Sequence, residues 1–223
     1  MTRRDVDVPE FKGERRWPVA ATILVLIAIP FLLPEEVFPR ALWATAPLEV
    51  ALLAAIAIVD PGRIDRRSQL LRGLSIGLTM LLAAIAALAT VWLVIELVDG
   101  APDLNDASTL LTTGALVWID VNLTFALLYW ELDGGGSAER LHDPREYPDL
   151  AFPEHLNPRV APPGWRPIFT DYFYLGFTNA TAFSPTDVMP LARWAKLMMV
   201  AQALMSIVIL ALVIANAVNL LGS

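Results

Sequence analysis

The chain has 223 residues, of which 56% are hydrophobic and 17% are charged, and its formal net charge is −7. This composition is too apolar for an ordinary soluble domain and indicates a membrane protein. The chain has no cysteine, and both histidines, His142 and His155, lie in a polar stretch. The sequence therefore excludes disulfides and thiolate metal sites and predicts no cofactor.

Five apolar runs are long enough to cross the ~30 Å of hydrocarbon in a bilayer, where the backbone must form helices. A polar tail of residues 1–16 comes first, and the runs cover residues 17–33, 41–59, 70–98, 107–131 and 190–221. The small residues Ala44, Thr45 and Ala46 allow the alternative of a cleaved signal peptide. They lie well beyond the first run, so we expect that run to stay as a span.

A shorter, aromatic-rich segment at residues 167–183 precedes the last run, with almost no connection between the two. We therefore expect it to enter the membrane and turn back. The predicted fold class is an all-α polytopic membrane protein with five transmembrane helices and one re-entrant pore-type helix. The expected organisation is three helices in residues 17–106 and a pore-type unit in residues 107–223, which includes a loop of little regular structure at 132–166.

The basic residues predict the orientation of these helices. All but one of the 16 Lys and Arg residues lie in the tail, in connections or at span ends that share one side of the membrane; the exception is Arg40. By the positive-inside rule the N-terminus is then cytoplasmic. We expect a multi-pass protein of a bacterial plasma membrane.

Residues 172–190 carry a resemblance to a known family. Their aromatic cluster and spacing are similar to the pore helix, filter and inner-helix start of tetrameric potassium-type channels, through Tyr172, Phe173, Tyr174, Phe177, Thr181, Asp187 and Pro190. The chain from residue 107 onward is also similar to an uncharacterised bacterial family of multispan membrane proteins. The resemblance implies a homotetramer with its filter at Thr181, Phe183, Ser184, Pro185, Thr186 and Asp187.

The filter segment departs from the channel pattern. Ser184 and Thr186 stand where the family has glycines, whose backbone freedom points carbonyls at the ion, so potassium-type selectivity is not expected. The charge pattern also brings this segment in from the cytoplasm, whereas the family's segment enters from outside. The alternative is that Asp187 or Thr186 caps the last helix, with Pro190 in its first turn.

Several polar residues fall inside the apolar runs. Glu49 and Asp120 lie midway along their runs, where a charge is costly and usually faces protein or water. Spacing predicts one helix face for Thr113, Asp120, Thr124 and Glu131, and another for Ala195, Gln202, Ser206 and Asn216. These two stripes either line a hydrated path or hydrogen-bond helices to one another.

From these features the leading hypothesis is a tetrameric pore that passes small ions passively through the lipid bilayer. Two alternatives stay open: a non-conducting scaffold or sensor that binds a partner through the loop at 132–166, and a proton-coupled carrier that uses Glu49 and Asp120. No nucleotide, metal or catalytic motif is present in the sequence, so we expect neither enzyme activity nor a nucleic-acid partner.

Overall fold

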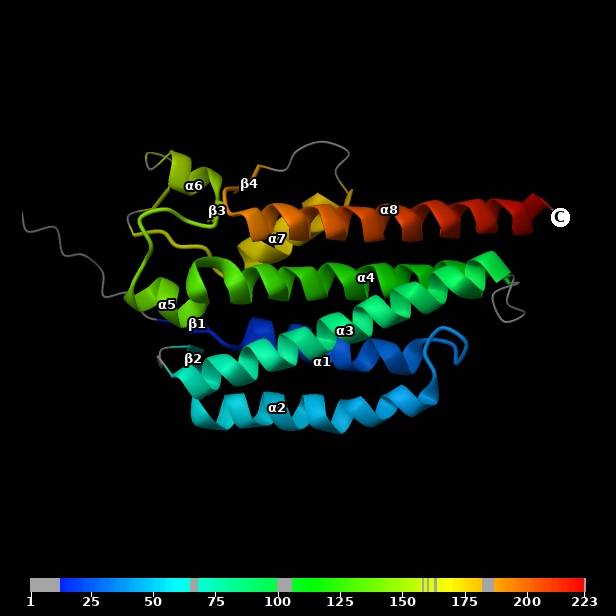
Figure 1. Cartoon of the computed structure of the whole chain (residues 1–223), viewed down its shortest axis with the longest axis horizontal. Coiled ribbons are helices and arrows are strands. Elements are labelled where there is room, and N and C mark those ends of the chain that lie inside the picture. The colour runs from blue at the N-terminus through cyan, green and yellow to red at the C-terminus, as the bar shows by residue number, and fades with distance from the viewer. Residues whose placement is uncertain are drawn as a thin grey trace, which may run out of the picture.

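The protein is a bundle of helices, seen in a computed structural model that describes residues 13–64, 68–99, 106–157, 159, 161–162, 164–181 and 187–222. Its main helices are α1 (Trp17–Ala28), α2 (Ala46–Val59), α3 (Gln69–Asp99), α4 (Ala107–Leu132), α7 (Phe169–Thr181) and α8 (Arg193–Gly222). Figure 1 shows five of them running along one long axis, with the shorter α7 beside the first half of α8.

Four stretches of helix are long and apolar enough to cross a membrane: Arg40–Val59, Gln69–Asp99, Ala107–Gly135 and Arg193–Leu220. They correspond to the second to fifth predicted spans, whose helical structure is confirmed. The first predicted span is shorter, because α1 passes into a 3-10 turn, η1 (Ile29–Leu32), before the chain reverses. The chain is therefore an all-α membrane protein whose described residues include four helices of spanning length.

The first two helices form an antiparallel hairpin that is closed at one end by two short strands. The chain reverses through the 3-10 helix η2 (Arg40–Thr45), and β1 (Glu14–Arg15) then pairs with β2 (Arg63–Ile64). Gly62, with φ of +85°, turns the chain so that its carbonyl accepts from the Arg16 amide at 3.0 Å. Arg16 also forms an ion pair with Asp60 at 2.7 Å, which ties the start of α1 to the end of α2.

Helix α4 lies at the centre of the bundle and packs against α3, α7 and α8. Its N-terminus is capped by Asp106, whose carboxylate accepts from the Thr109 amide at 2.9 Å. Val117, Val121 and Ala126 have no exposed surface. Among its polar side chains, Asp120, Asn122 and Thr124 are buried in the middle of the helix.

The connection between α4 and α7 is more ordered than we expected, and the expectation of little regular structure is wrong for its described part. It contains η4 (Asp133–Gly135), α5 (Ser137–His142), β3 (Leu150–Ala151) and α6 (Pro153–Leu156). The Asp133 carboxylate accepts from the Leu150 amide and the Tyr172 hydroxyl. Arg140 donates to the carbonyls of Trp130 and Asp133 at 2.7 and 2.6 Å. These tertiary contacts hold the short elements in place.

The chain enters α7 and returns from it at the same end of the bundle. At its start, the Phe169 amide donates to the Glu14 carboxylate of β1. After it, β4 (Met189–Pro190) pairs antiparallel with β3, and the Asp149 carbonyl accepts from the amides of Leu191 and Ala192 at 2.9 and 3.1 Å. Since α7 has 13 residues, its length of about 20 Å is less than the thickness of hydrocarbon.

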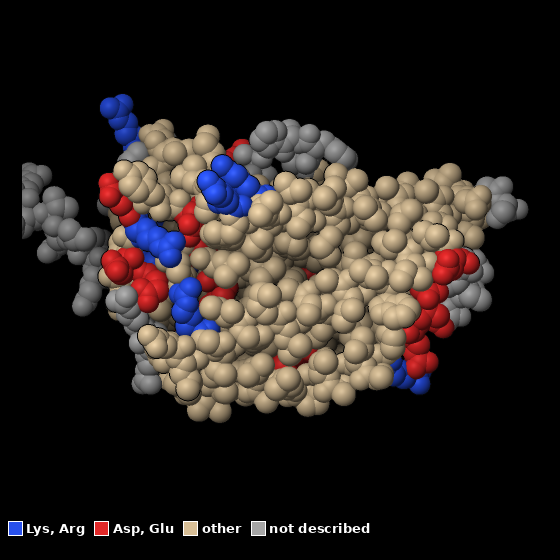
Figure 2. All heavy atoms as spheres, in the orientation of Figure 1, with Lys and Arg blue, Asp and Glu red and all other residues tan. Residues whose placement is uncertain are grey.

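Most charged side chains gather at the two ends of the bundle, as Figure 2 shows, and a broad belt separates them in which few acidic atoms reach the surface. Basic residues mark the end that holds α5, β1 and β2, whereas acidic residues dominate the visible face of the opposite end. Large apolar side chains lie exposed within the belt, among them Leu197, Val200, Leu204, Ile207, Ile214 and Val218 of α8. A belt of this kind is the surface that lipid covers.

Candidate functional site

Gln202 of α8 is the centre of a buried hydrogen-bond network that joins three helices. Its Oε1 accepts from the Tyr129 hydroxyl and from Asn179 Nδ2, both at 2.8 Å. Its Nε2 donates to the Gly176 carbonyl at 2.8 Å and to Asn122 Oδ1 at 3.2 Å. Gln202 has no exposed surface, and its amide makes four hydrogen bonds that link α8 to α4 and α7.

A glycine lets α7 reach this network. A Cβ at Gly176 would lie 3.2 Å from the Asn122 carbonyl oxygen and 3.4 Å from the Ala126 Cβ. The small residue allows the two helices to approach closely, as small residues do between membrane helices. Nearby, Trp118 of α4 meets Phe177 of α7 edge to face, with ring centroids 5.9 Å apart. The result is that α7 is packed into the protomer.

The acidic stripe on α4 lies on the face opposite this network. Asp120 is two residues before Asn122, about 200° around the helix. The residues predicted to share a face are all buried: Thr113, Asp120, Thr124 and Glu131. Gln202 therefore does not face the acidic stripe, and a single path lined by the predicted α4 and α8 stripes is not what the helices form.

Glu49 of α2 and Asp120 of α4 are both about 3% exposed, and their carboxyls lie close enough to repel each other when both are ionised. Glu49 Oε1 has no hydrogen-bond partner. Within the described part of the chain, no side chain donates to Asp120, and no basic residue forms an ion pair with either acid. Among the described residues, these two buried carboxyls therefore have no ion-pair partner.

A hydroxyl and a third acid lie on the Asp120 face of α4, and a second buried hydroxyl lies on α8, one turn after Gln202. Thr124 Oγ1 lies one turn from Asp120 on the same face of α4 and is buried without a hydrogen-bond partner. Ser206 Oγ on α8 is also buried without one. Nearer the basic end, Glu131 Oε2 accepts from Ser75 Oγ of α3 at 2.6 Å. Glu131 also borders a cavity of about 370 Å³.

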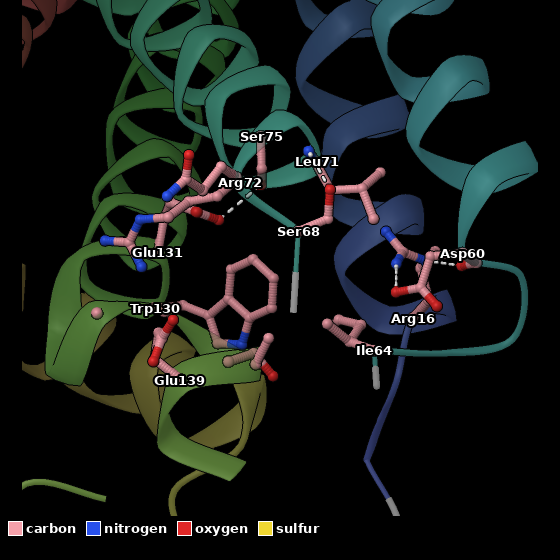
Figure 3. Close-up of a pocket in the computed structure, with 15 residues that line it drawn as sticks. Arg16, Asp60, Ile64, Ser68, Leu71, Arg72, Ser75, Trp130, Glu131 and Glu139 are labelled. Atoms are coloured by element: carbon pink, nitrogen blue, oxygen red, sulfur yellow. Dashed lines mark hydrogen bonds and ion pairs between the residues drawn. The ribbon is translucent and has the colours of Figure 1, made fainter. Parts of the chain in front are cut away.

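The cavity opens among α3, α4, α5 and the start of α1, as Figure 3 shows. Its charged lining residues are Arg16, Asp60, Arg72, Glu131 and Glu139. The Trp130 ring lies in the wall between Glu131 and Ile64 (Figure 3). The ring is fixed because its Nε1 donates to Glu14 Oε2 at 2.9 Å.

Glu14 joins the elements at this end. Besides Trp130, its carboxylate accepts from Ser137 Oγ at 3.3 Å and from the Phe169 amide. Burial raises the pKa of Glu14 above its usual value of about 4.5, against the hydrogen bonds and the Arg140 charge that lower it. Glu14 is thus a structural junction between β1, α4, α5 and α7.

The predicted filter residues are only partly described. Thr181 is exposed and its hydroxyl donates to the Phe177 carbonyl at 2.9 Å. Asp187 is exposed and accepts from the Tyr174 hydroxyl at 3.0 Å. The other four, Phe183, Ser184, Pro185 and Thr186, lie outside the described residues. The amide of Asn216 donates to the Leu212 carbonyl of its own helix.

Sequence reasoning missed most of the Gln202 network. The site residues predicted from the sequence include none of its partners Asn122, Tyr129, Gly176 and Asn179. The available signal was the spacing of Asn122 and Tyr129, which are seven residues apart and therefore share a face.

Among the described residues, no group of three or more His, Asp or Glu side chains could hold a metal ion. The arrangement offers proton-binding carboxyls in the middle of the bundle and a charged cavity at one end. Comparison with protein-family models, curated proteins and solved structures finds no match to this chain, so the resemblance to potassium-type channels stays a prediction that rests on its own residues.

Proposed function

We propose that the protein is a proton-coupled membrane carrier in which Glu49 and Asp120 bind and release the proton. The observation that carries the proposal is the pair itself: two buried carboxyls from different helices, within electrostatic reach of each other and without a basic ion-pair partner among the described residues. An isolated Asp at the centre of a membrane helix costs about 2.5–3.5 kcal/mol by insertion scales. The state of the pair with the lowest free energy therefore carries at least one proton.

The surrounding groups support movement of that proton toward the basic end. Along α4, Thr124 follows Asp120 by about 6 Å, and Glu131 follows Thr124 by about 10 Å. Thr79 is buried on α3 one turn beyond Ser75, the hydroxyl that donates to Glu131. Hydroxyls and carboxyls at such spacings can relay protons with the help of water.

The proposed topology has five crossing helices and one that enters and returns. α1 and η1 have 12 and 4 residues, which gives about 26 Å, slightly less than the hydrocarbon thickness and tolerated by local thinning. α7 dips in from the basic end, since β3 and β4 pair there. The basic residues favour a cytoplasmic N-terminus in a bacterial plasma membrane.

The test uses the purified chain in lipid vesicles that contain a pH-sensitive dye, with a potassium diffusion potential as the driving force. We expect proton flux that Asp120→Asn and Glu49→Gln each abolish, while Asp187→Asn, an exposed acid near α7, leaves it unchanged. Infrared titration provides a second readout. A carboxylic acid C=O band that disappears at high pH should be absent from Asp120→Asn. Flux and band that persist in both pair variants would contradict the proposal.

A homo-oligomeric, tetrameric pore for small ions is the second candidate. It is favoured by the exposed face of α7, where Phe173, Tyr174 and Phe177 are 42%, 50% and 47% exposed and could meet another copy. Gln202 and Ser206, however, lie inside the protomer, so an α8-lined pore would be apolar. Passive current in planar bilayers, altered by Asp187→Asn but not by Asp120→Asn, together with a tetrameric mass, would favour the pore. A protein with neither current nor proton flux would be the non-conducting scaffold or sensor.

A further inference from the structure

The cavity at the basic end carries an inference that is independent of the proton site. It measures about 370 Å³, within the usual range of pockets for small ligands. Figure 3 shows α3 and the end of α4 on one side and the Arg16–Asp60 pair on the other. The charges that line it indicate the kind of molecule it fits.

Arg16 and Asp60 neutralise each other and are already satisfied. The Arg16 guanidinium donates to the Asp60 carboxylate at 2.7 Å and to its carbonyl at 2.8 Å. A bidentate contact of this kind leaves little capacity for a ligand. Among the described lining residues, the charges that remain to act on a ligand include the basic Arg72 and the acidic Glu131.

The N–H donors of the Arg72 guanidinium have no hydrogen-bond acceptor among the described residues. Within the described residues its guanidinium forms neither a hydrogen bond nor an ion pair of 4.0 Å or less. Its Nη1 lies beside the turn after α4, where a Cβ at Gly135 or Gly136 would come within 3.4 or 3.5 Å. Both glycines have positive φ, +87° and +92°, so the turn keeps this side of Arg72 free of side chains. A planar guanidinium in this setting suits a carboxylate or phosphate.

The acidic side chain of Glu131 lines the same cavity as Arg72. Glu131 accepts from Ser75 through Oε2, and its Oε1 is directed toward Gly136, whose Cβ would lie 3.7 Å away. The Trp130 ring borders the same space and is held by Glu14. An ammonium group is stabilised both by a carboxylate and by the face of an indole.

We propose that this cavity binds a small zwitterion that carries a primary ammonium group and an oxyanion, with Arg72 at the oxyanion and Glu131 and Trp130 at the ammonium group. A basic and an acidic residue in one lining, Arg72 and Glu131, fit a ligand of both signs better than a simple anion or a simple cation. The same chemistry has two sources at this level of a membrane protein. One is the headgroup of phosphatidylethanolamine, and the other is a free zwitterionic solute.

The experiment is calorimetric titration of the full-length protein in detergent with O-phosphoethanolamine and β-alanine, compared with glycerol 3-phosphate and ethanolamine. We expect a zwitterion to bind at least about tenfold more tightly than either singly charged molecule, equivalent to about 1.4 kcal/mol. The lipid arm compares lipid retained by the protein from nanodiscs of phosphatidylethanolamine with that from phosphatidylglycerol. Binding in detergent supports the solute, and selective retention of phosphatidylethanolamine alone supports the headgroup.

The variants locate the site. Arg72→Gln and Glu131→Gln should each weaken binding at least about tenfold. Arg145→Gln should not, because Arg145 is exposed at the same end and pairs with Asp149 outside the cavity. The inference is overturned if neither arm gives binding, if singly charged molecules bind equally well, or if Arg72→Gln has no effect. The comparison of zwitterionic with singly charged ligands uses only the wild-type chain. It therefore tests the inference even if a variant does not fold. Proton flux is a separate readout, so either proposal can fail alone.

Discussion

Replacing Gln202 by leucine should destabilise the bundle far more than its position in a membrane helix suggests. Leucine is similar in size to glutamine and more apolar, so hydropathy alone predicts a gain. The structure predicts a loss, because four hydrogen bonds disappear at once. Tyr129 has no exposed surface, so its hydroxyl would be left without a partner. Asn179 would keep only its bond to the Met199 carbonyl.

The expected magnitude follows from measured hydrogen bonds between membrane helices. They average about 0.6 kcal/mol each, so four give about 2.4 kcal/mol. The stranded Tyr129 hydroxyl adds part of the 1–3 kcal/mol that a buried unsatisfied group costs, roughly, in proteins. We therefore expect Gln202→Leu to lower the free energy of unfolding by about 2–4 kcal/mol.

The assay is SDS titration of the folded protein in mixed micelles, followed by circular dichroism. The matched control is Leu204→Ala on the same helix, since Leu204 is 60% exposed and makes no part of the network. A double-mutant cycle with Tyr129→Phe should give a coupling energy of about 0.6–1.7 kcal/mol. If Gln202→Leu costs no more than the control, or the cycle shows no coupling, the network does not hold α8 in place.

Three further predictions concern packing and pH. Gly176→Ala should lower the free energy of unfolding by about 1–3 kcal/mol, because the new Cβ meets the Asn122 carbonyl. The control is Gly77→Ala, whose Cβ meets nothing within 4 Å. Equal effects of the two substitutions in SDS titration would refute this prediction. Because burial raises the pKa of Glu14, stability that is complete below about pH 4.5 is lost as pH rises through the raised pKa. Glu14→Gln should flatten that slope in thermal unfolding. Burial lowers the pKa of His155, so stability should fall as pH drops below its usual value of 6.5, and His155→Phe should remove that acid sensitivity.

The long helices were predictable from the sequence because the signal is local. Uncharged runs of spanning length must be helical in lipid, and α3 and α4 begin and end within one residue of the predicted runs. The start of α8 was missed by three residues. Met189 and Pro190 pair with β3, a strand some 40 positions earlier in the chain, and periodicity within a segment carries no information about such a partner.

The same limit applies to the polar residues. Spacing grouped Asp120, Thr124 and Glu131 correctly on one face of α4, and all three are buried. Residue spacing within one helix does not indicate which neighbouring helix packs against which stripe. Gln202 was therefore associated with the acidic residues, although its partners on α4 are Asn122 and Tyr129 on the opposite face.

The Gln202 amide and the acidic pair differ in how fully their polar atoms are satisfied, and this difference supports the proposed function. On the amide face, Gln202 uses both lone-pair positions and both N–H donors, which is what a structural network requires. At the acidic pair, Glu49 Oε1 of α2 and Thr124 Oγ1 of α4 have no hydrogen-bond partners, and Asp120 is within electrostatic reach of Glu49. A bundle selected only for stability gains nothing from such a pair, since apolar residues would pack there at no electrostatic cost. Under the proposed function, a proton rather than a neighbouring helix completes the site at Glu49 and Asp120.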